Sequence, residues 1–310
     1  MDLPFEIKNK LESLLDGYSL STLKNTSFLI SESYKSSDNH LKDDLTTKVY
    51  SVVRFPATYS ACYDALSHTF ELVDYEIKSL VDVGGGSGAS SLAASTIFPS
   101  INVSVFEKEE KMIEIGKYLF SDNDKVSYKK FDVTKEEIND QADLVVASYL
   151  LNELDEPVRL DVVKKMWEST DGVLLIVEPG TAKGFEIIRS VRDYLSSIGG
   201  EIIAPCPNID KCPMKDNNWC HFSSRVNRSK LHKTLKEGDS PFEDEKYSYI
   251  AFCKKKVNRC SSRILRHPNI YNGYVELDIC SSSGENKLKV SKKDKEAYKL
   301  ARKAKAGDKF

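Results

Sequence analysis

The sequence lacks any apolar run that approaches the roughly 20 residues of a membrane-spanning helix. Its first twenty residues, MDLPFEIKNKLESLLDGYSL, lack the basic start and apolar core of a secretory signal. They also lack the arginine-rich, acid-poor character of a mitochondrial presequence. We therefore expect a cytoplasmic protein without membrane contact, and a mitochondrial one only if the source is eukaryotic.

The chain contains seven cysteines. Because it lacks an export signal, we expect them to be reduced thiols rather than disulfides. Cys206, Cys212 and Cys220 fall within fifteen residues, and Cys280 follows sixty residues later. Neither half contains the C-x2-C pair that structural zinc sites favour. The loose spacing and the neighbouring prolines suit an iron–sulfur cubane held by a wrapped loop. Zinc and unligated thiols remain the alternatives.

The chain has little net charge, −2, but the charge is segregated. Residues 221–310 contain 22 Lys and Arg against 11 Asp and Glu, so a basic end follows an acidic body. Such an end suggests an anionic partner, with RNA first, although a solvated lysine-rich tail is the simpler alternative. Basic clusters interleaved with aromatic residues favour RNA. These are Arg225, Arg228, Lys230, His232, Lys233, Lys254, Lys255, Lys256, Arg259, Arg263 and Arg266, with Tyr247, Tyr249 and Phe252.

Hydrophobic periodicity predicts an α/β protein of four parts. Residues 1–75 are helical, with Pro56 in a first helical turn and a loop over 36–44. Residues 76–203 alternate short apolar strands with helices, which predicts a Rossmann-type parallel sheet. Residues 204–286 form a cysteine-rich module whose strands could complete that sheet, with a turn at Asn272-Gly273. Residues 287–310 are a basic tail, either helical or a disordered arm.

A glycine-rich loop joins the first predicted strand to its helix in the order Asp82, Gly84, Gly86, Gly88. It satisfies a dinucleotide fingerprint, but Asp82 would repel a pyrophosphate. A carboxylate there favours S-adenosylmethionine, which is cationic and has no phosphate. Glu107, at the end of the second strand, is placed to bind ribose hydroxyls. A dinucleotide and a purely structural turn remain alternatives.

Methyl transfer is less clearly indicated. The fourth strand ends in SYLLNEL, without the Asn/Asp-Pro-Pro-aromatic motif of amino-methylating enzymes. Asn152 and Glu153 occupy the matching region, where they either contact the cofactor or substrate or simply begin a helix. The sequence therefore leaves the catalytic residues unknown.

The motifs VDVGGGSG, DLVVASYLLNEL, VEPGT, IIAPCPNIDKCP, WCHFSSRVNRSKLHK and EKYSYIAF resemble the methyltransferase-like assembly factors of the small ribosomal subunit. The match covers roughly residues 50–310. It implies a class I methyltransferase-type domain that binds S-adenosylmethionine, with Asp132 near adenine. It also implies a [4Fe–4S] cluster on Cys206, Cys212, Cys220 and Cys280, and binding to rRNA and proteins of the immature small subunit. We expect the protein to be a monomer. Catalysis is doubtful for this family, and an active rRNA methyltransferase is the alternative. The chain departs from the family pattern in Ala306-Gly307-Asp308, where an aromatic often precedes Gly-Asp.

Overall fold

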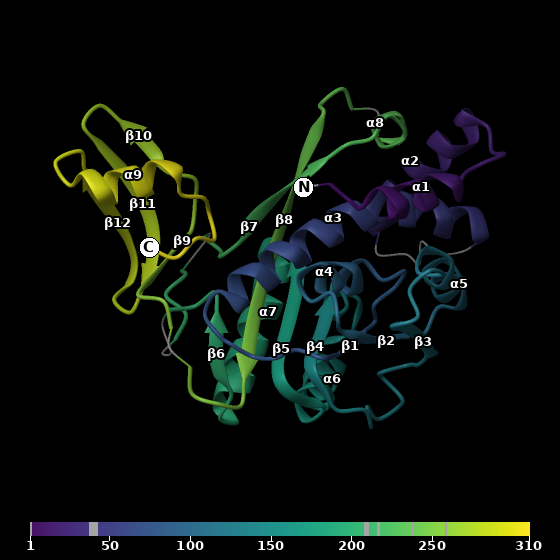
Figure 1. The fold of residues 1–310 in the computed structure, drawn as a ribbon, viewed down its shortest axis with the longest axis horizontal. Helices are drawn as coiled ribbons and strands as arrows, with labels where there is room; N and C mark the ends of the chain where they lie inside the picture. Colours follow the sequence, from purple (N-terminus) through teal and green to yellow (C-terminus); the bar gives the residue numbers. More distant parts are fainter. Residues whose placement is uncertain (1, 37–42, 208–210, 216–217, 237, 258) are drawn as a thin grey trace.

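The computed structural model describes residues 2–36, 43–207, 211–215, 218–236, 238–257 and 259–310. An eight-stranded sheet forms its centre, with helices on both faces (Figure 1). The strand order is β3-β2-β1-β4-β5-β8-β6, and β7 pairs with β8. Its strands are β1 (Ser79–Val83), β2 (Asn102–Glu107), β3 (Val126–Lys130), β4 (Ala142–Ser148), β5 (Thr170–Pro179), β6 (Glu201–Ala204), β7 (Phe222–Asn227) and β8 (Phe242–Cys253).

The first five strands pair in parallel, whereas β8 runs antiparallel to β5, β6 and β7. Strands covered on both faces read as continuous apolar runs, as in the VLLIV segment of β5. Val173 and Leu175 face one core and Leu174 and Ile176 face the other. This parallel sheet with an antiparallel β8 near its edge is a class I methyltransferase-like fold, which confirms the fold expected from the sequence.

Helices cover the two faces of this sheet as separate layers. On one face lie α1 (Phe5–Ser13), α3 (Asp44–Phe70), α4 (Ala89–Ile97) and α5 (Glu110–Leu119), and on the other α6 (Glu156–Glu168) and α7 (Ala182–Ser197). The remaining helices of the body are α2 (Leu20–Ser36), η1 (Leu151–Glu153) and α8 (Lys230–Leu235). No helix within the described ranges is long and apolar enough to cross a membrane.

Pro56 was expected in a first helical turn, and that expectation is wrong, because it lies inside the 27-residue α3. The residues around it, Phe55 and Tyr59 among them, are buried against the sheet. That burial offsets the backbone hydrogen bond that proline cannot make. Of the predicted loop over 36–44, positions 37–42 lie outside the described residues.

A smaller antiparallel sheet lies at one end of the molecule (Figure 1). It contains β9 (Ser262–Ile264), β10 (Asn269–Tyr271), β11 (Tyr274–Ser281) and β12 (Gly284–Ser291), with α9 (Lys295–Lys303) packed on one face. The turn expected at Asn272-Gly273 joins β10 to β11. The strands β6, β7 and β8 belong to the large sheet. The boundary between the two sheets therefore lies after β8, whereas the cysteine-rich module was expected to begin at residue 204. We call the unit from Ser262 to Phe310 the C-terminal module.

The last residues of the chain return to the junction between the two sheets. Ile264 donates its N–H to the Asp308 carbonyl at 2.9 Å, and Gly307 donates to the Ile264 carbonyl at 2.8 Å. Gly307 has φ +99° and lies so close to the His68 ring of α3 that a Cβ there would be 2.7 Å from Cε1. The tail is therefore docked on both β9 and the methyltransferase-like domain.

This docking predicts that Gly307→Ala releases the tail. Left-handed strain and the clash with His68 should together lower the free energy of local opening by about 2 kcal/mol or more. Tryptic cleavage after Lys305 should then become about 30-fold faster. Gly199→Ala is the matched control, because Gly199 has φ +88° but no neighbour within 4 Å. Equal cleavage rates in both variants would contradict the docked tail.

Candidate functional site

The glycine loop lies at the point where the strand order reverses. From β1 the chain builds β2 and β3 on one side, and then β4 and β5 on the other, so a crevice forms at the carboxyl ends of β1 and β4. Gly84, Gly86 and Gly88 have φ values of +65°, +57° and +93°, which non-glycine residues rarely adopt. The loop then begins α4, whose N-terminus presents free N–H groups to this crevice.

Asp82 is fully buried at the end of β1. Its Oδ2 accepts hydrogen bonds from the hydroxyls of Ser90 and Ser91, both at 2.6 Å. Its Oδ1 is buried and has no hydrogen-bond partner among the described residues. Burial raises the pKa of Asp82 to about 6, against the opposing effect of the two serine hydroxyls. The loop therefore holds a carboxylate oxygen that lacks a donor.

Glu107 supports the loop from the end of β2. Its Oε2 accepts from the Gly86 N–H at 2.8 Å, and its Oε1 accepts from the Glu109 N–H at 2.9 Å. Burial raises the pKa of this carboxyl group. Each oxygen keeps a second lone pair, so hydroxyl donors can still be accepted.

Asp132 and Asn152, the other two predicted cofactor contacts, have local partners. Asp132 follows β3 and accepts from the Thr134 hydroxyl at 2.6 Å, which with Lys135 lowers its pKa to about 2. Asn152 lies in η1 and donates from Nδ2 to the Tyr149 carbonyl at 2.8 Å and to Glu178 Oε2 at 3.0 Å. Asp82 and Glu107 thus both lie at the glycine loop. The roles of Asp132 and Asn152 in cofactor binding stay predictions.

Two acids that the sequence reasoning missed organise the end of β4. Glu178 is fully buried and accepts from the N–H groups of Leu151 and Asn152 at 2.8 and 3.2 Å. Burial raises its pKa to about 7. An acid at the carboxyl end of an apolar strand, as in Glu107, was the available signal for Glu178.

The second acid, Glu245 of β8, joins three elements at the same crevice. Tyr149 donates from its hydroxyl to Glu245 Oε1 at 2.9 Å, and Arg54 of α3 donates to both Glu245 oxygens at 2.9 and 3.3 Å. Tyr149 is the single non-glycine residue with positive φ, +57°, in the ranges that the structure describes. No sequence pattern predicts this Arg54–Glu245–Tyr149 network, because its three residues lie far apart in the chain.

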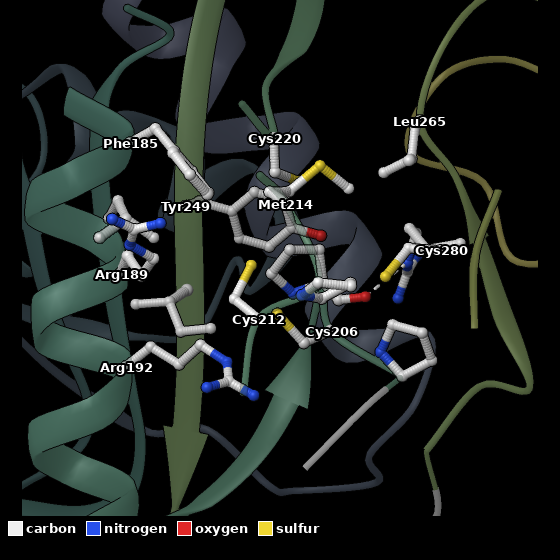
Figure 2. A pocket seen from close by; sticks show the side chains of 16 residues that line it. Phe185, Arg189, Arg192, Cys206, Cys212, Met214, Cys220, Tyr249, Leu265 and Cys280 are labelled. Atoms are coloured by element: carbon white, nitrogen blue, oxygen red, sulfur yellow. Dashed lines mark hydrogen bonds between the residues drawn. The ribbon is translucent and has the colours of Figure 1, made fainter. Parts of the chain in front are cut away.

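The four predicted metal ligands line one pocket (Figure 2). Cys206, Cys212 and Cys220 come from the connection between β6 and β7, and Cys280 comes from β11. All four are free thiols, and the pocket is also lined by Phe185, Met214 and Leu265. Within the described residues, no three Cys, His, Asp or Glu side chains are arranged around one point that could hold a single metal ion.

Two arginines are buried beside these thiols. Arg192 of α7 is 3% exposed and pairs with Asp193 at 2.8 Å. Arg263 of β9 is 1% exposed and donates to the carbonyls of Pro205 and Gly307 at 3.2 and 2.7 Å. Its Nη2 is buried without a hydrogen-bond partner in the described part of the chain. The pocket therefore combines four thiols with buried positive charge.

Burial raises the pKa values of all four thiols, to about 11 for Cys206 and about 12 for Cys280. Without a metal they are neutral near pH 7, so they offer no charge to the neighbouring guanidinium groups.

The expected RNA surface of interleaved basic and aromatic residues is wrong in its aromatic part. Tyr247 and Tyr249 are each 1% exposed and Phe252 is fully buried, because β8 is an inner strand of the large sheet. Several of the basic residues are also engaged within the protein. Arg225 pairs with Asp244, Arg228 with Glu243 and Arg259 with Glu201, Arg266 bonds Asn218, and His232 and Arg263 are buried.

The family can be recognised once this architecture is known. The sequence profile described as mitochondrial small ribosomal subunit Rsm22 matches residues 44–310. The chain belongs to the Rsm22 family. The resemblance expected from the sequence motifs is thereby confirmed.

Curated relatives of this Rsm22 chain come from eukaryotes. The Rsm22-cox11 tandem proteins 1 and 2, mitochondrial, of Schizosaccharomyces pombe are each 25% identical over 343 residues, covering 91% of this chain but 45% of theirs. The chain therefore spans less than half the length of these two relatives. Ribosome assembly protein METTL17, mitochondrial, of Homo sapiens is 22% identical over 334 residues, covering 97% and 68%. Among solved structures, the N-methyltransferase NodS of Bradyrhizobium japonicum is similar at TM-score 0.48 and 12% identity, covering 72% of this chain and 99% of NodS.

The buried carboxyl of Asp82 predicts a pH-dependent stability. A pKa near 6 in the folded chain, against about 3.9 unfolded, means that stability present below pH 4 is lost as pH rises through 6. The isosteric variant Asp82→Asn avoids this loss. Its stability relative to the wild type should therefore rise by about 2 kcal/mol between pH 4 and pH 7 in denaturant unfolding without ligand. A difference that does not change with pH would show that Asp82 is not buried as a carboxylate.

Proposed function

We propose that this chain is an assembly factor of the small ribosomal subunit. It binds immature rRNA on an S-adenosylmethionine-binding, methyltransferase-like scaffold that also contains a [4Fe–4S] cluster. The observation that supports this function most directly is the match of 267 residues, 44–310, to the Rsm22 family. The human relative is named a ribosome assembly protein. The relatives are named mitochondrial, the location expected here for a eukaryotic source.

The glycine loop fits S-adenosylmethionine. Asp82 Oδ1 is a buried acceptor without a donor, and the cofactor's amino group is a cationic donor of the kind it lacks. Glu107 retains lone pairs for ribose hydroxyls while holding Gly86 in place. The bound cofactor carries a transferable methyl group, so its presence alone does not distinguish an enzyme from a ligand-stabilised scaffold.

The Arg54–Glu245–Tyr149 network favours the scaffold over the enzyme. Ligands of such sheets lie outside the carboxyl ends of the strands, where Tyr149 follows β4. There Tyr149 is tied to Glu245, and Glu245 is held by both guanidinium nitrogens of Arg54. A substrate base would have to break this charge-assisted network to approach from that side. The active rRNA methyltransferase is therefore the second candidate.

The cysteine pocket supports a cluster more than a zinc ion. Zinc requires its thiolates on one tetrahedron with bonds of about 2.3 Å, and structural zinc sites favour a C-x2-C pair, which this cysteine group does not contain. A cubane binds each thiolate through a different iron, so its ligands lie farther apart around one pocket. Cys206, Cys212, Cys220 and Cys280 would hold it, and Arg192 and Arg263 would offset its negative charge.

The cluster would have a structural role in this account. Cys280 belongs to the C-terminal module, whereas the other three cysteines belong to a connection of the large sheet. One centre bound by both parts fixes the module against the sheet. We therefore propose that this junction keeps the rRNA-binding surface in shape. We expect the protein to act as a monomer.

Metal analysis tests the cluster. Anaerobically purified protein should contain about four irons and four sulfides per chain. Cys280→Ser should lose most of both, because one of four ligands is removed. Cys62→Ala, at a buried core thiol of α3 outside the pocket, should retain them. One zinc per chain without sulfide would refute the cluster but leave a metal site, and metal-free protein would refute both.

Cells that lack the protein test its role. We expect them to accumulate immature small subunits while keeping every rRNA methyl mark, and we expect the protein to crosslink to precursor rRNA. A strain carrying Asp82→Ala should also keep every mark. Loss of one defined mark in both strains would establish the methyltransferase instead. Absence of rRNA crosslinks in wild-type cells would refute the assembly function.

A further inference from the structure

The large sheet ends in a two-stranded arm. β5 pairs with β8 as far as Tyr247, whereas β7 pairs with the stretch of β8 from Phe242 to Tyr247. β7 and this stretch of β8 therefore extend past the carboxyl end of β5 and lead to α8 (Figure 1). One side of the arm packs on α3, where the Ser60 and Ser224 hydroxyls share a hydrogen bond, and the other side is exposed.

The exposed side of the arm carries three cross-strand pairs. They are Ser223 with Lys246, Arg225 with Asp244, and Asn227 with Phe242. Residues that lie directly opposite each other in an antiparallel pair share one side of the ladder, so their side chains are neighbours. The aromatic and basic residues of this side are therefore different from the buried tyrosines on the side that faces α3.

Arg225 is fixed on this exposed side. Its guanidinium carbon lies 3.9 Å from the centre of the Phe242 ring, and its Nε and Nη2 donate to the two Asp244 oxygens at 2.8 and 3.0 Å. The ring supports the guanidinium plane and the carboxylate fixes its edge, while 56% of the side chain stays exposed. A guanidinium group held in this way is a preorganised, planar cation.

The C-terminal module adds a basic side chain at the root of the arm. Arg266, between β9 and β10, donates from Nη2 to the Trp219 carbonyl at 3.0 Å, and His221 Nδ1 lies 3.1 Å from the same oxygen. The Trp219 ring donates to the Gly180 carbonyl at 3.0 Å, and Gly180 donates its N–H to the Lys246 carbonyl at 2.8 Å. Burial lowers the pKa of His221, and the charges of Arg266 and Lys246 lower it further, as expected for close neighbours.

The next residue of the module, His267, is exposed near Arg225. Hydrogen bonds from Arg225 lower the pKa of Asp244, and the nearby His267 lowers it further. Since Asp244 is already bonded to Arg225, the surface keeps positive charge. We call this surface the junction face, because it combines residues of the arm and of the module. It consists of Arg225, Lys246, His221, Arg266 and His267.

We propose that the junction face binds unpaired nucleotides of RNA. Unpaired bases stack on exposed guanidinium planes, and Arg225 offers such a plane. Lys246 and Arg266 lie beside it, where they can contact the phosphates of the same strand. The inference rests on the proposed rRNA-binding function, and it identifies the surface that the junction between the two sheets would keep in shape.

Replacement of Arg225 by lysine tests the stacking, because lysine keeps the charge but has no plane. Binding of the full-length protein, purified anaerobically, to a labelled 12-nucleotide single-stranded RNA is measured by fluorescence anisotropy. Arg225→Lys should weaken binding by about fivefold or more. On an abasic strand of the same length, the variant and the wild type should bind within about twofold of each other, because that strand has no bases to stack.

Arg302→Lys is the matched control for this variant. Arg302 is also exposed and lies 5.9 Å from the centre of an aromatic ring, that of Tyr298, but it belongs to α9. The control should bind both strands like the wild type. The melting temperature and iron content of each variant should match the wild type, which separates lost binding from lost structure.

Lys246→Ala tests the phosphate contacts independently of the stacking. It should weaken the binding of both strands and make the salt dependence shallower by about 0.7 in log–log slope, the value for one phosphate contact. Lys254→Ala removes another exposed lysine, just beyond the opposite end of β8, and should leave the slope unchanged.

Three outcomes would overturn the inference. These are equal losses on the normal and abasic strands in Arg225→Lys, unchanged binding in both Arg225→Lys and Lys246→Ala, and a loss in Arg302→Lys as large as that in Arg225→Lys. If wild-type protein crosslinks to precursor rRNA in cells but these variants bind like wild type, the junction face is wrong and the assembly function stands. If wild-type protein makes no rRNA crosslink, the assembly function fails as well.

Discussion

The side chain of Arg263 is buried where three parts of the chain meet, and the arrangement of the molecule depends on that contact. Its guanidinium group donates to Pro205, at the end of the large sheet, and to Gly307, in the tail, while its backbone pairs with Cys280 in the small sheet. A buried guanidinium group is costly unless negative charge or acceptors surround it. Two carbonyls satisfy part of this requirement, and one nitrogen remains without a partner. A thiolate-bound cluster in the adjoining pocket would supply the missing negative charge, and in the same position it would join the small sheet to the large one.

Buried charge also shapes the crevice of the large sheet. At the crevice of the large sheet, buried carboxylates keep a glycine loop in a shape that suits a cationic cofactor. Beside it, the Arg54–Glu245–Tyr149 network ties α3 and β8 to the residue that follows β4.

The sequence predicted most of the large sheet because buried parallel strands read as uninterrupted apolar runs, as in β4 and β5. It also predicted that Asp82 and Glu107 lie at the same site, since they are at the carboxyl ends of neighbouring parallel strands. Tyr247 and Tyr249 were wrongly expected at an exposed RNA-binding surface. An alternation of polar and aromatic residues does not reveal whether the aromatic face of a strand is covered, and on β8 that face packs against α3. Tyr149, Glu245 and Arg54 could not be predicted, since their contact depends on tertiary packing and on a positive φ that tyrosine rarely adopts.

Hydrogen–deuterium exchange in metal-loaded and metal-stripped protein tests the central claim that the metal centre holds the C-terminal module in place. The account predicts that amides of β9 and of residues 304–310 lose protection when the metal is removed, while amides of β1, β4 and β5 keep theirs. Unchanged protection of β9 and the tail in stripped protein would contradict it, because the module would then be held by Arg263 and the backbone contacts alone.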